Sequence, residues 1–562
     1  MDTRYVLFGY WLERNFEIDK QNSFLKPYDE VNNYNQMGGG KKKKWTTLAH
    51  NGVMFPPEYK PHGIPVLYKG EKIKLETEAE EYATLYAKCS DTDYCDNDIF
   101  NKNFWEDWSE ILGKSHKIQD IENCDFKLIY NHVIDEKQKK KAATVQEKAD
   151  KELDEKLYKT AIVDGKEQPV GNFRVEPPGI FIGRGCNPKL GKLKRRVYPE
   201  DITLNIGRDA DVPKAPDGHK WGKIIHDQYV EWLASWKDNI TGKLKYVWLG
   251  AHSDAKAQSD MKKFDLARKL KKKMKTIREM NEKNLTNQSE KMRQIGTALY
   301  FIDNYALRVG NEKGEDQTDT VGVTSLRVEH IELLESNIVK LDFLAKDSVR
   351  YNRTLPVSAQ VYKNLEEFIK NKKNSAQLFD KITSNDVNKY LQLFMKGLSA
   401  KVYRTYNASS LFQKELTKLN KKYTKDTALN ILLDEFNKAN AKVALLCNHQ
   451  KNITKNNNEQ ILKMDEKIKK ARAQLRKAKK SSRKSAEKLA NIRDKIKKLK
   501  AKKDLKIELK NVSLGTSKTN YIDPRITVAF LKRYNVPVEK VFSVALREKF
   551  KWAFDVDENW KF

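Results

Sequence analysis

Cysteine is scarce in this chain, and its few cysteines are scattered. The 562 residues include five cysteines, none of them in a CxxC spacing: Cys89, Cys95, Cys124, Cys186 and Cys447. An odd, scattered set indicates neither a disulfide framework nor a zinc site. We therefore expect no metal centre and a reducing, intracellular compartment.

Long apolar runs are also missing. No stretch reaches the roughly eighteen apolar residues that a membrane helix needs, so no membrane span is expected. The opening residues Met1, Asp2, Thr3 and Arg4 begin no apolar segment, which argues against a secretory signal. The chain has neither a GxxxxGK[ST] phosphate loop nor a carboxylate cluster for a metal. Any phosphoryl-transfer chemistry would therefore depend on its own cations.

What the chain has in excess is positive charge. Its 108 Lys and Arg residues exceed its 77 Asp and Glu residues, which leaves a formal net charge of +31. This excess predicts a polyanionic partner, and nucleic acid is the commonest polyanion. Charge alone would equally fit a soluble protein with a lysine-rich surface, or a ribosome-associated protein.

The chain is too long for one compact core, so roughly two to four domains are expected. Its hydrophobic content of 39% is enough to form cores. Residues 1–44 are predicted to be an irregular tail that ends in lysines, either a nuclear-import patch, a phosphate-binding arm or a plain linker. From 45 to about 248 the pattern is mixed, with strands expected at 63–68 and 246–249. Pro65 would put the first strand at a sheet edge or at its own start.

Helical patterns dominate the rest of the chain. Residues 136–158 are rich in Lys and Glu and are predicted to form a charged helix in solvent. A strand is expected at 338–343. Further helices follow from apolar spacing of three and four, at 264–274, 289–309, 358–370, 385–398 and 427–448.

The segment 459–506 is the most basic part of the chain, with twenty basic and six acidic residues. Its apolar residues recur every three or four positions in two blocks, interrupted at Ser481 and Ser482. This pattern predicts an antiparallel helical hairpin, with a single continuous helix as the alternative. A narrow apolar seam of this kind is typical of a protruding arm and not of a packed domain.

A tyrosine follows this arm. Tyr521 lies between a turn predicted at 514–518 and the break marked by Pro524. A phenol in this setting can be a nucleophile toward a phosphodiester, provided that cations stabilise the charge that develops. Arginine suits this clamping because its planar fork donates two hydrogen bonds to phosphate, and lysine can supply a proton.

The remaining chain offers such groups in order. Arg308 is predicted to end a helix before a glycine, and Lys346 to lie in a turn after a strand. Arg404 lies in the stretch 401–409, and His449 closes an apolar helix. Each residue alone has an ordinary structural explanation, such as capping, solvation or packing. Their order, ending in a tethered tyrosine within a strongly basic chain, is much harder to explain by chance.

These stretches closely resemble eukaryotic-type DNA topoisomerase I, the type IB class. The resemblance covers about residues 45–562 and rests on specific motifs: 176–181, 183–185, 193–196, 199–202, 218–221, 306–313, 325–331, 401–409, 446–450, 514–528 and 547–555. It implies that Tyr521 attacks the scissile phosphate and forms a 3′-phosphotyrosyl link. It further implies that Arg308, Arg404 and His449 stabilise the transition state and that Lys346 protonates the leaving 5′-oxygen.

The resemblance also implies a multidomain α+β fold, mostly helical, that forms a bilobed clamp on duplex DNA. Its parts would be a tail (1–44), a mixed α/β cap lobe (45–250), a helical catalytic lobe (251–455), an antiparallel coiled-coil linker (456–508) and a small helical C-terminal domain (509–562). The DNA-binding residues would be Arg184, Lys194, Arg195, Lys313, Asp347, Lys401, Thr516 and Asn520.

The implied activity is relaxation of positive and negative supercoils without ATP, metal or any other cofactor. The implied partner is double-stranded DNA, bound by a monomer in the nucleus, or in a virion or viral replication site if the chain is viral. A camptothecin-type inhibitor would bind at the nick, beside Arg184, Asp347 and Asn520.

Two other functions remain open from the residues alone. A tyrosine recombinase shares this chemistry but typically has a HisxxArg motif at the second arginine, where this chain has Lys401 before Arg404. A non-enzymatic DNA- or RNA-binding scaffold would explain the charge and the hairpin, but not the ordered set of catalytic groups.

Overall fold

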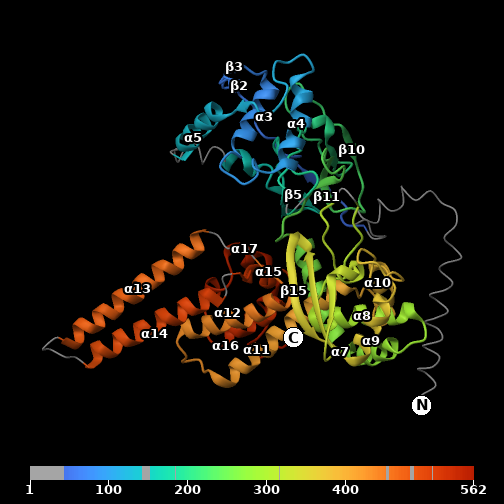
Figure 1. Cartoon of the computed structure of the whole chain (residues 1–562), viewed down its shortest axis with the longest axis vertical. Helices are drawn as coiled ribbons and strands as arrows, with labels where there is room; N and C mark the ends of the chain where they lie inside the picture. The colour runs from blue at the N-terminus through green and yellow to red at the C-terminus, as the bar shows by residue number, and fades with distance from the viewer. Residues whose placement is uncertain are drawn as a thin grey trace. The chain divides into compact units, whose positions relative to one another are not determined.

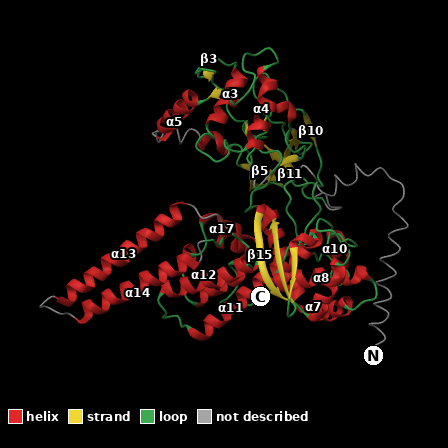
Figure 2. Ribbon diagram, in the orientation of Figure 1, coloured by secondary structure: helices red, strands yellow, loops and turns green. Residues whose placement is uncertain are grey.

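The computed structural model describes residues 43–141, 152–183, 185, 187–314, 317–450, 455–480, 486–508 and 511–562. Arg184 and nearly all of the expected tail lie outside these residues. The protein is a multidomain α+β chain, about half helical, with several small sheets (Figure 2). Its described residues fall into two compact units.

The first unit contains described residues of 43–61, 132–179 and 194–250. It is built on two small sheets. One has the strand order β1 (Leu48–His50), β5 (Thr160–Val163), β6 (Lys166–Pro169), all antiparallel. The other has the order β10 (Lys223–Ile225), β9 (Thr203–Asn205), β11 (Trp232–Lys237), β12 (Leu244–Trp248), in which only the β9–β10 pair is parallel.

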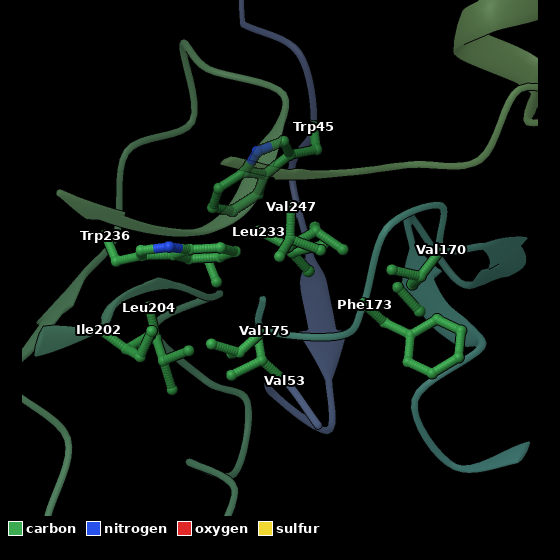
Figure 3. Packing of buried hydrophobic residues seen from close by; sticks show 13 residues of the cluster. Trp45, Val53, Val170, Phe173, Val175, Ile202, Leu204, Leu233, Trp236 and Val247 are labelled. Atoms are coloured by element: carbon green, nitrogen blue, oxygen red, sulfur yellow. The ribbon is translucent and has the colours of Figure 1, made fainter. Parts of the chain in front are cut away.

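An apolar core joins these sheets (Figure 3). Five successive residues of β11 are buried, so this strand is covered on both faces. Trp45 packs in the same cluster, and its indole N–H donates to the Val230 carbonyl at 3.0 Å. Burying an indole in this way satisfies its polar group while removing a large apolar area from water.

The second unit begins with residues 62–131 and 180–193. Its first sheet has the order β3 (Glu71–Ile73), β2 (Val66–Tyr68), β4 (Cys124–Asp125), and α3 (Thr77–Ala87) and α4 (Asp98–Leu112) lie between these strands in the chain. β2 begins directly after Pro65, as predicted for a proline at a strand start. Strands β7 (Gly179–Ile180) and β8 (Leu193–Lys194) lie where the chain passes between the units.

The predicted charged helix at 136–158 is observed in part. Helix α5 spans Lys127–Lys141, and residues 152–156 are again helical. Residues 142–151 lie outside the described residues.

The rest of the second unit, 251–562, is mainly helical around one sheet (Figure 1). The strands β13 (Ile331–Leu334), β14 (Ile338–Ala345) and β15 (Val349–Pro356) form an antiparallel meander. The helices before the basic hairpin are α7 (Asp254–Leu285), α8 (Glu290–Tyr305), α9 (Ala359–Ile369), α10 (Ser384–Gln392), α11 (Ala400–Lys422) and α12 (Leu429–Leu446). The predicted helices and the strand at 338–343 are confirmed, apart from the ends discussed below.

Helix α7 shows why the periodicity was informative. Its buried apolar residues recur at helical spacing and face the neighbouring helices: Phe264, Ala267, Leu270, Met274 and Ile277. The Ser253 side chain caps its first turn by accepting from the Lys256 N–H.

The basic segment forms an antiparallel pair of helices, α13 (Lys455–Lys480) and α14 (Ala486–Glu508), which lie side by side (Figure 1). Lys503 on α14 binds Asp465 on α13 at 2.6 Å, which a single continuous helix could not do. The buried seam includes Ile468 and Ala471. The hairpin prediction is therefore confirmed, and the continuous helix is excluded. The chain ends in α15 (Leu514–Asn520), α16 (Pro524–Arg533) and α17 (Val544–Lys549).

Three local predictions were wrong. Helix α8 ends at Tyr305 and not at 309, because Ala306 adopts a left-handed conformation with φ of 51°. The helix expected at 385–398 ends at Gln392, and the chain continues from there as turns. The stretch 514–518, predicted as a turn from its small polar residues, is the start of helix α15. Tertiary contacts stabilise that helix, since Asn440 Nδ2 donates to the Leu514 carbonyl.

Candidate functional site

A pocket in the second unit brings together residues from six separate stretches of the chain. Its lining includes Arg308, Lys346, Arg404, His449 and Thr516, and the Tyr521 ring lies against His449. The sheet contributes apolar residues to the wall, such as Phe343 and Tyr351. Four cationic or imidazole groups that are far apart in sequence therefore line one cavity, and the phenol ring of Tyr521 lies against one of them.

Arg308 reaches this pocket from an extended segment, which corrects its predicted place at a helix end. After the left-handed Ala306, the chain leaves α8 and the Arg308 carbonyl accepts from the Val323 N–H at 2.9 Å. Gly310 and Gly322 make this approach possible. A Cβ on Gly322 would lie 2.5 Å from the Gly310 Cα, closer than any side chain tolerates.

Arg404 is anchored more tightly than any other cation of the site. It lies on α11 with 5% of its surface exposed. One Nη donates to the Ala306 carbonyl and the other to the Cys447 carbonyl at 2.8 Å. Its guanidinium carbon lies 5.2 Å from the centre of the Tyr521 ring. The contacts tie α8, α11 and the end of α12 to one fixed positive charge.

Lys346 and Asp347 lie in the tight connection between β14 and β15. The connection is a short 3₁₀ turn, Lys346–Ser348, in which Asp347 and Ser348 have φ of 66° and 55°. Such left-handed conformations turn the chain sharply, and Lys346 and Asp347 both line the pocket. Lys346 is exposed, so its ammonium is accessible to a ligand.

His449 lies just beyond the end of α12 and is 7% exposed. Its Nδ1 lies 2.6 Å from the Ser517 hydroxyl, and its ring centre 5.2 Å from that of Tyr521. Its Nε2 is buried and has no hydrogen-bond partner among the described residues. Burial lowers the pKa of His449 to about 3, with Arg404 and Arg308 acting in the same direction, so the imidazole is neutral at neutral pH.

Tyr521 is the residue that caps α15. Its N–H donates to the Ser517 carbonyl at 2.9 Å, and its own carbonyl accepts from Ser409 Oγ at 3.0 Å. Its phenol oxygen accepts from Arg308 Nη1 at 3.3 Å. Burial alone would raise the pKa of this phenol, but the charges of Arg404 and Arg308 outweigh it and hold the pKa below the ordinary 10.0.

The expected DNA-binding residues are found in several places. Thr516 and Asp347 line the pocket. Lys401 is exposed in the first turn of α11, Asn520 is exposed at the end of α15, and Lys313 is exposed after Gly310. Lys194 and Arg195 belong to the first unit, where Lys194 binds Glu176 at 3.1 Å and the Arg195 N–H donates to Asn239. Arg184 lies outside the described residues.

Two serines that support the site were not predicted. Ser409 and Ser517 are both fully buried, and each contacts a proposed catalytic residue. Ser409 Oγ also accepts from the Asp523 N–H, so it holds the backbone on both sides of Ile522, the residue directly after Tyr521. A buried serine in a helix carries no distinctive sequence pattern, although Ser517 lies four residues, one helical turn, before Tyr521.

In the part of the chain that the structure describes, no three His, Cys, Asp or Glu side chains gather closely enough to hold a metal ion. None of the described helices combines the length and the apolar character that crossing a bilayer requires.

Comparison with known families shows matches along most of the chain. Residues 43–249 match the family model of the eukaryotic DNA topoisomerase I DNA binding fragment. Residues 252–482 match that of the eukaryotic DNA topoisomerase I catalytic core, and residues 493–562 match a C-terminal topoisomerase domain.

Individual proteins are similar over the same range. The chain is 44% identical to DNA topoisomerase 1 alpha of Arabidopsis thaliana, over 93% of this chain and 60% of that protein. It is 40% identical to DNA topoisomerase 1 of Homo sapiens, over 92% and 72% of the two chains. It is 39% identical to DNA topoisomerase 1 of Candidozyma auris, over 93% and 84%. The chain thus spans 60% of the length of the Arabidopsis relative and more of the other two.

Proposed function

We propose that this chain, which belongs to the eukaryotic DNA topoisomerase I family, relaxes supercoiled duplex DNA by cutting and resealing one strand through Tyr521. The observation that carries the proposal is the environment of the Tyr521 hydroxyl. It accepts from Arg308, while Arg404 and His449 lie against its ring. A phenol whose pKa is lowered in this way is suited to nucleophilic attack.

The first step is an exchange of phosphodiester bonds. The Tyr521 oxygen forms a bond to the scissile phosphorus as the bond from phosphorus to the 5′-oxygen breaks. The phenol proton passes to solvent, and Lys346 gives a proton to the leaving 5′-oxygen. The product is a 3′-phosphotyrosyl link and a free 5′-hydroxyl. One phosphodiester replaces another, so resealing runs the same steps backwards and needs neither ATP nor metal.

Stabilisation of the transition state falls to Arg308, Arg404 and His449. Negative charge grows on the non-bridging oxygens during attack, and donors already aimed at that position lower the barrier. Two buried atoms of the site support this role, since neither Arg404 Nε nor His449 Nε2 has a hydrogen-bond partner in the described residues. A bound phosphate would supply the acceptors that these groups lack.

DNA would be held by a clamp. Residues 45–250 would form its cap lobe and residues 251–455 its catalytic lobe, with the α13–α14 hairpin as a coiled-coil linker beside the duplex and residues 509–562 as the domain that carries Tyr521. Direct phosphate or nick contacts would come from Arg184, Lys194, Arg195, Lys313, Asp347, Lys401, Thr516 and Asn520. We further propose that the protein acts as a monomer in the nucleus and that camptothecin-type compounds bind at the nick.

Replacement of Tyr521 by Phe tests the proposal. Tyr521→Phe removes only the attacking oxygen, so we expect duplex binding within about twofold of the parent, no relaxation and no covalent complex. Relaxation is measured on a plasmid in EDTA without ATP, and the covalent 3′-linked complex is trapped with denaturant. Tyr534→Phe is the matched control, since Tyr534 lies in the same C-terminal region as Tyr521 and its hydroxyl, which binds Asn420 on α11, should be dispensable for cleavage.

Three outcomes would contradict the proposal. Relaxation by Tyr521→Phe at the parental rate would mean that another group is the nucleophile. Strict dependence of the parent on one target sequence would favour a tyrosine recombinase, and DNA binding without any cleavage by the parent would favour a non-enzymatic scaffold.

A further inference from the structure

The contact between His449 and Ser517 has a consequence for proton placement. Ser517 is fully buried on α15, and its hydroxyl oxygen lies 2.6 Å from His449 Nδ1. Within the described residues, Nδ1 is the only side-chain partner of this hydroxyl, and Nε2 on the other side of the ring has none. One nitrogen of the imidazole is thus held by the protein, and the other is left for a ligand.

We propose that Ser517 is a positioning residue: its hydroxyl donates to Nδ1 of His449 and so keeps the imidazole proton on Nε2, where it can donate to the scissile phosphate. This inference rests on the proposed function, because it assumes that a phosphate occupies the pocket. It assigns Ser517 a role through His449 and no direct contact with DNA.

The protonation state of His449 makes the assignment specific. A neutral imidazole carries one proton, so one ring nitrogen donates and the other accepts. His449 is neutral because burial and the two arginines lower its pKa to about 3. An Nε2 lone pair would repel the oxyanion that develops in the transition state, whereas an Nε2 proton would stabilise it. The productive state therefore needs Nδ1 as the acceptor, and Ser517 is the donor in reach.

The backbone of Ser517 binds the nucleophile as well. Its carbonyl accepts from the Tyr521 N–H at 2.9 Å and from the Ile522 N–H at 3.0 Å. One residue therefore orients the imidazole through its side chain and the phenol through its main chain. Ser517→Ala removes only the hydroxyl and leaves these backbone bonds in place, and alanine is a good helix former. The variant should fold and isolate the side-chain role.

Nitrogen chemical shifts of His449 test the tautomer directly. The full-length protein is labelled with ¹⁵N-histidine, and the His449 resonances are assigned from their loss in His449→Gln. In the parent we expect the shifts of a neutral ring protonated on Nε2 between pH 6 and pH 8. In Ser517→Ala we expect averaged shifts that reveal both tautomers. Parental shifts of an Nδ1-protonated ring would overturn the proposal without any substitution at Ser517.

Single-turnover cleavage of a duplex tests the consequence. We expect Ser517→Ala to slow cleavage about tenfold with unchanged duplex affinity, as for the loss of a partner that orients a functional histidine. The matched control is Ser410→Ala, because the Ser410 hydroxyl is buried on α11 without a hydrogen-bond partner in the described residues. It should cleave at the parental rate.

A double substitution separates positioning from packing. In a His449→Ala background the hydroxyl has no imidazole to orient, so adding Ser517→Ala should slow cleavage no further. An equal tenfold loss in both backgrounds would mean a structural role and would overturn the proposal. If the parent forms no covalent complex at all, the proposed function fails, while the nitrogen shifts still decide whether Ser517 sets the tautomer.

Discussion

Burial and nearby positive charge have opposite effects on the pKa of the Tyr521 phenol. Removing it from water favours the neutral form, and two arginines favour the phenolate. The arginines prevail because one donates directly to its oxygen and the other lies close to its ring. Burial keeps His449 neutral, and the same arginines lower its pKa further. One pair of fixed cations therefore lowers the pKa of both the nucleophile and its neighbour.

The pH dependence of cleavage should reflect this tuning. Since the pKa of Tyr521 is lowered, we expect the second-order rate of single-turnover cleavage to rise with pH and to level off below pH 10. Arg308→Gln removes one cation from the phenol, so it should move this inflection to higher pH and also lower the plateau. The measurement is the rate at subsaturating enzyme from pH 5 to pH 10.

Two comparisons make that measurement decisive. Arg350→Gln is the control, because Arg350 pairs with Asp342 and should leave the inflection unchanged. His449→Gln should lower the rate evenly from pH 5 to pH 8, since a group with a pKa of about 3 does not titrate there. A parental inflection near 6.5 that disappears in His449→Gln would contradict the buried, neutral imidazole.

Helix α16 holds the tyrosine segment in place through a buried ionic cluster. Asp523 is fully buried, caps the helix by accepting from the Arg525 N–H, and pairs with the Arg525 guanidinium at 2.8 Å. Arg525 also binds Asp265 on α7, and its guanidinium lies over the rings of both Trp552 and Trp560. Burial raises the pKa of Asp523, and its partner Arg525 offsets this effect only in part.

Loss of Arg525 should therefore release this helix. Arg525→Met leaves the Asp523 carboxylate buried without its partner, which typically costs about 3–5 kcal/mol. We expect a lower thermal unfolding midpoint, faster proteolysis within residues 511–562 and loss of the covalent complex. Arg472→Met, at an exposed position of α13, is the control and should change stability by less than about 0.5 kcal/mol. Equal stability of the two variants would contradict the inference that Arg525 holds α16 in place.

The charge of the whole molecule matches a phosphate-binding function. The net charge of +31 is concentrated in part in the hairpin segment 459–506, with its twenty basic and six acidic residues. Binding by such a surface releases counterions from DNA and depends little on base sequence.

The affinity for duplex DNA should accordingly depend steeply on the salt concentration. For a protein that contacts about six to ten phosphates, we expect affinity to fall by about 10³–10⁵ between 50 and 200 mM monovalent salt, with the same slope for unrelated duplex sequences. Fluorescence anisotropy with Tyr521→Phe measures this without cleavage. A slope near zero, or one that changes with sequence, would be inconsistent with a clamp that grips the backbone.

Much of the helical architecture could be predicted from the sequence. Spacing of three and four located α7, α9, α12 and the α13–α14 hairpin, because burying one face of a helix imposes that period. The order of cations and the tethered tyrosine also identified the five candidate catalytic residues, and the charge excess indicated a polyanion. Apolar spacing and motif order are local properties of the sequence, and the charge excess is a sum over the whole chain.

The site itself depended on contacts that no local pattern records. Arg308 and Tyr521 meet across 213 residues, and His449 and Ser517 across 68. The left-handed Ala306 diverts Arg308 from its predicted helix, and packing turns the polar stretch before Tyr521 into α15. A serine hydroxyl, a glycine pair or a lowered pKa acquires meaning from the groups placed around it, and folding alone brings those groups together.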